Sequence, residues 1–304
     1  MKFIIALFFS LISGCYCSAQ NERDMIIKDS ILPILNSNKI LKENNYFKIK
    51  SLIIEIERKF GYETELKKKL IEGSYHHKDM SFFKREIKEL IKNHGFQIEY
   101  LSGNENYFND ICYGELSKWF KSVYSKNHSK WIKNNFSKVM ELKKINDLYL
   151  KDQIIARLSS NLINDLNFDS LQKEVILKES NKLYFENITF LYEISKKYGK
   201  LPNSKNFGII QNSYETVLIH NFRENTDETW LLLYPYFKKA YLNFEITNVV
   251  FQNYDFYCYL RHGYQEFNSF TIEQIPIDFR KNEGEIPLKN QEEFNKIKIE
   301  FKWF

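Results

Sequence analysis

Apolar residues in the first half of the chain recur at the three- and four-residue steps of a helix. Between about residue 21 and residue 135 they form three stripes, and each stripe is followed by a glycine that suits a left-handed helix end. The stripes with their glycines are Ile53, Ile56, Phe60 and Gly61; Leu66, Leu70, Ile71 and Gly73; and Phe83, Ile87, Leu90, Ile91 and Gly95. We therefore expect short amphipathic helices in this half.

The helix stops recur at a regular distance. Gly61 and Gly95 are 34 residues apart, and Lys92-Asn93-His94 returns 34 residues later as Lys126-Asn127-His128. This period is typical of tetratricopeptide-like repeats, in which stacked helix pairs form a concave surface that grips a peptide. Irregular helix pairs explain the same pattern, so the sequence leaves both interpretations open.

The pattern stays helical through most of the second half. One helix is expected from Leu142 into residues 150–160, and another over residues 185–198, with Gly199 and Pro202 as its stop. Two or three further helices are expected over residues 214–265. Within them, Pro235 is expected to interrupt or bend a helix.

The pattern changes near the C-terminus. TIEQIPIDF (271–279) is expected to be extended, because a proline at position 276 disfavours helix before it. IKIEFKWF (297–304) alternates apolar and charged residues as a strand does, but Phe294, Ile297 and Phe301 also fit a helix. Both interpretations of this last segment remain open.

Together these patterns predict a mainly α fold. We expect a separate segment over residues 1–19 and an N-terminal helical region of short helix pairs over residues 20–135, and these pairs are either tetratricopeptide-like repeats or irregular. A helical C-terminal domain follows over residues 136–304, with a small extended or β element near its end.

Residues 1–19 have the order of a signal peptide. Lys2 supplies a positive start, residues 3–12 form an apolar run, and small and polar residues follow from Ser13. The run is about half of the ~20 residues that a spanning helix needs, and it is apolar on every face, unlike an amphipathic first helix. We therefore expect an exported protein.

Two processing routes fit this segment. Ile12-Ser13-Gly14-Cys15 resembles a bacterial lipobox, which predicts lipid attachment at Cys15 and a membrane anchor. Cys17-Ser18-Ala19 instead supplies the small residues of ordinary cleavage, which would leave a periplasmic or secreted protein beginning at Gln20. The SAQNE ending and the Lys-, Asn- and Ile-rich composition resemble exported proteins of AT-rich Bacteroidetes.

Charge gives no sign of a nucleic-acid partner. The 304 residues include 44 Lys and Arg and 39 Asp and Glu, for a net charge of +5. The signs are mixed along predicted helices, as in KREIKELIK (84–92) and ELKKINDLYLKD (141–152). A nucleic-acid-binding protein usually concentrates its basic residues on one surface, so we interpret these segments as solvated helix faces.

The cysteines predict no metal site. Cys112 and Cys258 are the cysteines beyond the first nineteen residues, and their sequence separation leaves a disulfide and two buried thiols equally open. No Cys-x-x-Cys pair or Cys/His ligand spacing occurs in this part of the chain, so we expect neither a metal nor a cofactor.

Several marks in residues 140–304 resemble an uncharacterised family of exported bacterial proteins. They occur in the family's order and are Asp152-Gln153 with Arg157, Tyr198-Gly199-Lys200-Leu201-Pro202, the apolar run that closes on His220, Gly263-Tyr264-Gln265-Glu266-Phe267-Asn268-Ser269, and Pro276-Ile277-Asp278. The chain departs from the family at Arg157, which comes one residue late, and after Gln265, where Gly-Thr-Gln is replaced. The resemblance implies a related fold and a polar cluster of Asp152, Arg157 and Gln265, but no reaction.

Few side chains are candidates for chemistry. His220 ends an apolar run and suits a base at the mouth of a pocket, or a histidine hydrogen-bonded within the core. Asp255, Cys258 and His262 share one helical face, but their aromatic neighbours favour a core position over a catalytic triad. Serine-hydrolase, zinc-protease, P-loop and dinucleotide-binding motifs do not occur.

We therefore expect an exported cell-envelope protein with a non-enzymatic binding or assembly role and a protein or peptide partner. One alternative is an envelope hydrolase with a cleft near His220, Asp152 and Gln265. Another is an immunity or inhibitor protein. Nucleic acid is not an expected partner, and a membrane is expected only through the lipid at Cys15.

Overall fold

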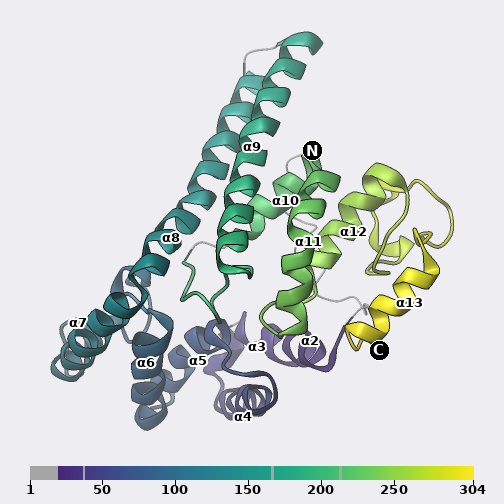
Figure 1. The fold of residues 1–304 in the computed structure, drawn as a ribbon. Helices are drawn as coiled ribbons and strands as arrows, with labels where there is room; N and C mark the ends of the chain where they lie inside the picture. The colour runs from purple at the N-terminus through teal and green to yellow at the C-terminus, as the bar shows by residue number, and fades with distance from the viewer. Residues whose placement is uncertain (1–19, 37, 166–167, 212–213) are drawn as a thin grey trace. The chain divides into compact units, whose positions relative to one another are not determined.

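The computed structural model describes residues 20–304 apart from residues 37, 166–167 and 212–213 (Figure 1). These residues are mainly helical, which confirms the predicted fold class. Extended pairing in the described part of the chain is confined to one isolated parallel bridge, between Gln265 and Leu288 near the C-terminus. The first nineteen residues and Cys15 lie outside the described residues, so export and lipid attachment stay predictions.

The chain forms two compact units, and each is assembled from separate stretches. Unit 2 consists of Asp29–Leu150 and Leu201–Tyr214; unit 1 consists of the described residues up to Lys28, Lys151–Lys200 and Glu215–Phe304. The division expected at residue 135 differs from this one, since residue 135 lies within α8 (Ser117–Asp165). That helix contains neither glycine nor proline, and it continues from unit 2 into unit 1.

Short helices follow one another in unit 2 up to α8. Their bounds are α3 (Leu32–Leu35), η3 (Asn38–Leu41), α4 (Glu43–Phe60), α5 (Thr64–His76), α6 (Met80–His94), η4 (Ile98–Tyr100) and α7 (Phe108–Cys112). α4, α5 and α6 have 18, 13 and 15 residues. The interpretation of these helices as repeats stays a prediction.

Two of the three predicted glycine stops are confirmed. α4 ends at Gly61, with φ 84°, and α6 ends at Gly95, which is left-handed with φ 68°. The prediction for Gly73 is wrong, because this glycine lies inside α5. A Cβ atom there would come within 3.0 Å of Ile40 and 3.1 Å of Tyr46, so the glycine serves close packing.

The core of unit 2 lies among α5, α6, α7 and the first turns of α8. Its fully buried apolar residues include Ile71, Phe83, Ile87, Leu90, Phe96 and Ile111. α8 has non-helical backbone angles at Asn135, whose side-chain amide donates to the Trp131 carbonyl at 2.9 Å. The side chain thus hydrogen-bonds to the preceding helical turn at the kink.

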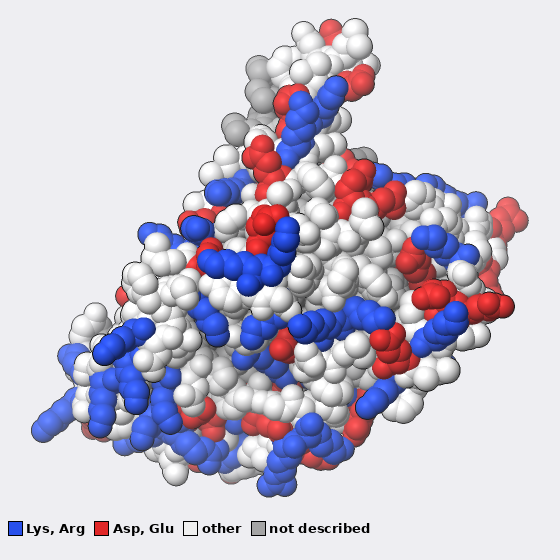
Figure 2. Space-filling view, viewed as in Figure 1, with Lys and Arg blue, Asp and Glu red and all other residues white. Residues whose placement is uncertain are grey.

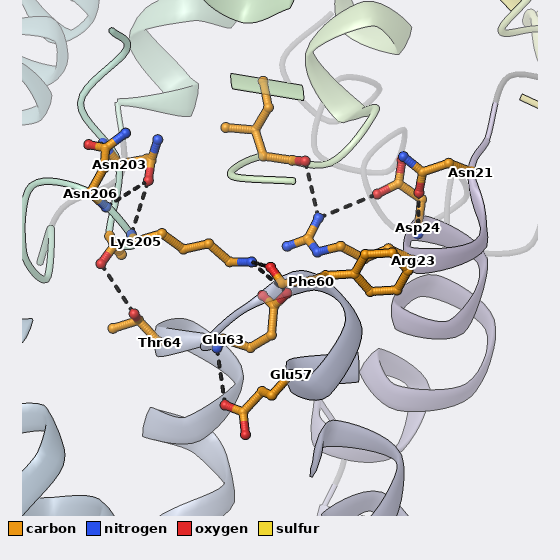
Figure 3. A network of polar contacts seen from close by, with 12 residues as sticks. Asn21, Arg23, Asp24, Glu57, Phe60, Glu63, Thr64, Asn203, Lys205 and Asn206 are labelled. Atoms are coloured by element: carbon orange, nitrogen blue, oxygen red, sulfur yellow. Dashed lines mark hydrogen bonds and ion pairs between the residues drawn. The ribbon is translucent and has the colours of Figure 1, made fainter. Parts of the chain in front are cut away.

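The segment Leu201–Tyr214 returns to unit 2 and is tied to it by polar contacts. Ile209 N donates to the His94 carbonyl at 2.8 Å. Lys205 Nζ lies 2.7 Å from Glu63 Oε1 and donates to the Phe60 carbonyl at 3.3 Å, as Figure 3 shows. The Lys205 and Glu63 side chains are both largely buried, so the return segment is part of this unit rather than a loose linker.

Unit 1 begins with short helical turns and continues through long helices. Its elements are α2 (Glu22–Met25), η2 (Ile26–Ile31, which crosses into unit 2), the second half of α8, α9 (Ser170–Tyr198), α10 (Glu215–Glu224), α11 (Thr226–Leu242), α12 (Val249–His262), η5 (Ile272–Gln274), η6 (Ile277–Phe279) and α13 (Gln291–Glu300). α9 starts with a capping box at Asp169, well before residue 185, from which the sequence predicts a helix, and it ends at the left-handed Gly199, as predicted.

Aromatic rings fill the core of unit 1. Trp230 stacks on Tyr254 with ring centroids 3.8 Å apart, and Phe251 and Phe267 pack edge-on against Trp230. Trp303 joins this cluster and donates its indole N–H to the Tyr241 hydroxyl at 2.7 Å. The chain's aromatic content is thus used for packing between α11, α12 and the C-terminal turn.

Buried polar groups anchor the start of unit 1. The Asp24 carboxylate accepts from the Tyr241 hydroxyl at 2.8 Å and from Asn248 N at 3.2 Å. Arg23 donates to the Ile246 carbonyl at 3.1 Å and lies 3.6 Å from the Asp24 carboxylate (Figure 3). These contacts attach α2 to the end of α11 and the residues that follow it.

Three local predictions in unit 1 are resolved. Pro235 lies inside α11, which continues past it to Leu242. The last segment is helical in α13 up to Glu300 rather than a strand. Residues 271–279 form the turns η5 and η6 instead of an extended segment, because Gln274 completes a capping box with Thr271 and Pro276 starts η6.

We predict that Gly95→Ala lowers the free energy of unfolding by about 2–4 kcal/mol. Alanine disfavours the left-handed backbone conformation that residue 95 adopts. Its methyl carbon would also lie 2.3 Å from the Trp131 ring, so this ring would have to move. Urea unfolding monitored by circular dichroism measures the change. Gly284→Ala is the matched control, because a Cβ atom there meets nothing within 4 Å, and an equal loss in both variants would contradict the packing argument.

Candidate functional site

Two of the three predicted site residues meet in unit 1. Asp152 lies on α8 and His220 on α10, and the imidazole Nδ1 is 2.8 Å from Asp152 Oδ2 and 3.0 Å from Oδ1. The Asp152 side chain is completely buried, while 18% of the His220 side chain remains exposed. The structure therefore joins a buried carboxylate to an imidazole that reaches solvent.

Three helices contribute to the surroundings of this pair. Asp152 and Ser159 lie seven residues apart on one face of α8, which is the face turned toward α9. Tyr184 of α9 packs its ring 5.1 Å from the His220 ring. Burial and the negative charge of Asp152 raise the pKa of the Tyr184 phenol, and a hydrogen bond with Ser159 opposes them.

The pair can accept a proton at one nitrogen. Because a carboxylate only accepts hydrogen bonds, His220 donates through Nδ1, and Nε2 of the neutral ring then carries the lone pair. Among the residues that the structure describes, none hydrogen-bonds to Nε2. The nearby Ser159 hydroxyl donates to the Ile155 carbonyl at 2.9 Å, so it is not aligned as a nucleophile for this base.

Gln265 does not join Asp152 and His220. Its amide nitrogen donates to Asn268 Oδ1 at 3.2 Å and to the Phe270 carbonyl at 3.1 Å, and its amide oxygen accepts from Phe270 N at 3.1 Å. These hydrogen bonds all lie within its own loop, and Gln265 is 99% buried. Arg157 is exposed on α8, so the polar cluster implied by the family resemblance does not form as expected.

Asp255 holds the same loop from α12. Its carboxylate accepts from Glu266 N at 2.8 Å, Phe267 N at 3.0 Å, Ser269 N at 3.1 Å and the Ser269 hydroxyl at 2.6 Å. Burial raises the pKa of Asp255 to about 7, while these hydrogen bonds lower it. Asp255 therefore fixes residues 266–269 and does not orient a histidine.

The array of Asp255, Cys258 and His262 is not a triad. Burial raises the pKa of the Cys258 thiol to about 12, which opposes formation of a thiolate. His262 instead contacts Asp227, with Nε2 3.0 Å from Oδ1. Cys258 and Cys112 are both buried free thiols, so of the two possibilities that the sequence leaves open, the structure shows two thiols and not a disulfide.

The described residues contain neither a metal-binding cluster nor a helix that could span a membrane. No group of three or more His, Cys, Asp or Glu side chains there is placed to hold a metal ion. No helix in this part of the chain combines the length and the apolar character needed to cross a bilayer.

A groove of about 900 Å³ follows α9 on unit 1. Apolar Leu177 and Phe185 lie in it among charged side chains from four turns of α9 and from the residues that follow α10. Its ten lining residues include Ser170, Lys173, Lys178, Asn181, Asn225 and Glu228, and His220 is not one of them. The sequence carries no sign of this groove, because the alternating Lys and Glu of α9 are also typical of a solvated helix.

Comparison with protein-family models, with curated proteins and with solved structures finds no match to this chain. The resemblance to the exported family therefore stays a prediction.

We predict that His220→Ala destabilises the fold by about 3–5 kcal/mol, because it leaves the buried Asp152 carboxylate without its imidazole partner. Chemical unfolding measures the loss. His262→Ala is the control, since its partner Asp227 is 53% exposed and an exposed pair contributes less than about 1 kcal/mol. Similar losses in the two variants would show that the Asp152–His220 pair does not support the fold.

We predict that Asp255→Asn destabilises the protein by about 2–3 kcal/mol, because its amide N–H groups would face the donors of Ser269. Ser269→Ala removes one of these hydrogen bonds and is expected to cost about 1 kcal/mol. Thermal melts compare the two variants. An unchanged melting temperature in Asp255→Asn would contradict the acceptor role of this carboxylate.

Proposed function

We propose that the chain is exported and acts in the cell envelope as a non-enzymatic binding protein for a segment of a partner polypeptide. The observation that carries the proposal is the groove along α9. Export and the envelope location rest on the signal-like order of the first nineteen residues.

The groove has the dimensions and lining that suit a peptide. Residues 170–185 of α9 extend over about 22 Å at 1.5 Å per residue, which equals about fifteen residues of helix or seven of extended chain. Leu177 is 44% exposed, so it is available to an apolar side chain of a partner. A helix or strand laid along α9 could bury this residue together with Phe185.

Charge around the groove favours an acidic partner segment. Lys173, Lys178 and Lys182 line it, against Glu174 and Glu228. Lys182 pairs with Glu179 at 2.6 Å, while no ion pair involves Lys173 or Lys178 within the described residues. An acidic residue beside the apolar anchor of the partner would complement these two lysines.

The composition of the groove supports binding rather than a reaction. None of its ten lining residues is a histidine or a cysteine, and Ser170 is its one hydroxyl. A serine nucleophile needs a base within hydrogen-bond reach, and none of the lining residues supplies an imidazole.

The alternative function, an envelope hydrolase, is favoured by the Asp152–His220 pair alone. The pair has the geometry of a base, but Gln265 does not join it, and the described Ser159 hydroxyl beside it is not aligned as a nucleophile. We infer that the pair supports the packing of α8 and α10, and that partner binding is the better interpretation.

Site-specific photocrosslinking tests the binding function. A photoreactive residue in place of Lys178 is expected to capture one partner from envelope fractions of the source cells, whereas the same residue in place of the 74% exposed Lys296 of α13 is not. Leu177→Glu should lower the yield at position 178 at least tenfold, because a buried carboxylate would replace an apolar contact.

Leu231→Glu is the matched control, since Leu231 is 80% exposed on α11 and does not line the groove. Equal yields at positions 178 and 296, or an equal effect of the two glutamates, would contradict a peptide site in the groove. Hydrolytic activity that is lost in a folded His220→Gln variant would favour the enzyme instead.

A further inference from the structure

The first half of α8 departs from the charge pattern of the other helices. Residues 117–140 contain six lysines and neither Asp nor Glu. The chain's overall balance hides this stretch, because the segments on which the charge argument rests, 84–92 and 141–152, lie on either side of it. The net charge summed over successive short windows of the sequence would have revealed it.

The structure places five of these lysines on the solvent side of one helix. We call them the lysine face; they are Lys118, Lys121, Lys126, Lys130 and Lys133, and all are exposed. Ser122, Ser125 and Ser129 are exposed between them. The opposite side of the helix carries Phe120 and Trp131, which are buried. The exposed side of this half of α8 is therefore almost entirely lysine and serine, extended over about 22 Å.

Among the described residues, no acidic side chain forms an ion pair with the lysine face. Some exposed lysines on other helices pair with neighbours, as Lys59 does with Glu55, Lys182 with Glu179 and Lys296 with Glu293. In the described part of the chain no ion pair involves any of the five. Like charges three or four residues apart on a helix repel each other, as Lys126 and Lys130 do. The lysine face therefore lowers the stability of α8 when no anionic partner covers it.

Lysines of α6 extend the positive surface. Lys84 lies over the Trp119 ring of α8, with Nζ 5.5 Å from the ring centroid, and Lys88 and Lys92 are exposed on the following turns of α6. In Figure 2, blue side chains gather over the part of unit 2 where Figure 1 shows α6, α7 and the start of α8.

We propose that the lysine face binds the surface of an anionic lipid bilayer. Lysine is a compact, strongly hydrated charge that interacts with headgroups without fixed geometry, and clusters of four to eight basic residues on a helix are typical of binding to anionic lipids. The proposal does not depend on the α9 groove, and it adds a membrane contact to the lipid anchor expected at Cys15.

Apolar residues beside the lysine face favour a bilayer over nucleic acid. Phe136 and Met140 are 63% and 48% exposed and lie one turn apart just after Lys133. Side chains of this kind enter the boundary between headgroups and acyl chains. Nucleic-acid surfaces instead combine basic residues with exposed aromatic platforms and with Arg, Asn or Gln that read bases. The exposed residues of the lysine face itself are lysine and serine, and the aromatic residues Phe120 and Trp131 on the opposite side of the helix are buried.

Vesicle flotation tests the proposal with the full chain. The measured quantity is the ratio of binding to phosphatidylglycerol-containing vesicles over binding to pure phosphatidylcholine vesicles, so that any contribution of the apolar N-terminal segment is common to both. We expect a ratio of about 100 or more that falls toward one at about 1 M salt, where charges are screened beyond ~3 Å.

Two variants of equal net charge separate a site from general attraction. In the face variant, all five lysines of the lysine face become glutamine, and we expect the ratio to fall at least about 50-fold, since each lysine near an anionic surface contributes roughly fivefold. The control variant replaces five lysines elsewhere, and we expect its ratio to fall less than about fivefold. The control positions are Lys48, Lys59, Lys196, Lys296 and Lys302, which are exposed and lie outside the α9 groove. Circular dichroism should show that both variants are folded, because the replaced side chains are exposed.

A third variant distinguishes a bilayer from nucleic acid. Phe136→Ser is expected to weaken vesicle binding about tenfold without changing any binding to double-stranded DNA. Equal losses in the face and control variants would overturn the proposal. Tighter binding to DNA than to anionic vesicles at the same salt, with loss in the face variant, would also overturn it and identify a nucleic-acid surface.

Discussion

The packing of α8, α9 and α10 in unit 1 depends on how the carboxylate of Asp152 is accommodated. This side chain is completely buried, and burial of an unpaired carboxylate costs several kcal/mol. His220 offsets this penalty by placing Nδ1 within 3.0 Å of both carboxylate oxygens, and the Gln153 amide donates to Oδ2 at 3.2 Å. The contact specifies the position of α10 against α8, and the packing of Tyr184 on His220 adds α9 to the same layer.

Several buried polar side chains hydrogen-bond between separate segments of the chain and hold them together. Asp255 holds the loop after α12, Lys205 holds the return segment of unit 2, and Asp24 anchors the start of unit 1. With few glycines and prolines, the chain uses buried hydrogen bonds to set many of its turns. The groove along α9 and the lysine face of α8 are different, because their polar groups point outward and several have no partner in the described chain. We therefore assign binding to these outer surfaces and packing to the buried pairs.

Much of the helical framework was predictable, because helix periodicity and glycine stops are local properties. Gly61, Gly95 and Gly199 end helices as expected, whereas Gly73 does not, since its role is set by Ile40 and Tyr46, which precede it by more than 25 residues. The tail was ambiguous because its residues fit two periods, and only packing of Phe294 and Ile297 into the core selects the helix.

The candidate site was less predictable than the fold. Asp152 and His220 are 68 residues apart, so periodicity says nothing of their contact, and they were grouped only as part of the cleft of the hydrolase alternative. Gln265 was expected beside them, but local bonds to Asn268 and Phe270 use its amide. The α9 groove left no signal because alternating charge on a helix is the same whether a partner or water covers it.

A double-mutant cycle on Asp152 and His220 tests most directly whether this pair supports the packing of unit 1. Free energies of unfolding would be measured for Asp152→Ala, His220→Ala and the double variant. We predict a coupling energy of about 2 kcal/mol or more, with the double variant no less stable than His220→Ala, because removing both partners leaves no unpaired buried charge. If the losses of the two single variants add up in the double variant, the interaction energy between Asp152 and His220 is zero. That result would contradict the claim that their contact supports the packing of unit 1.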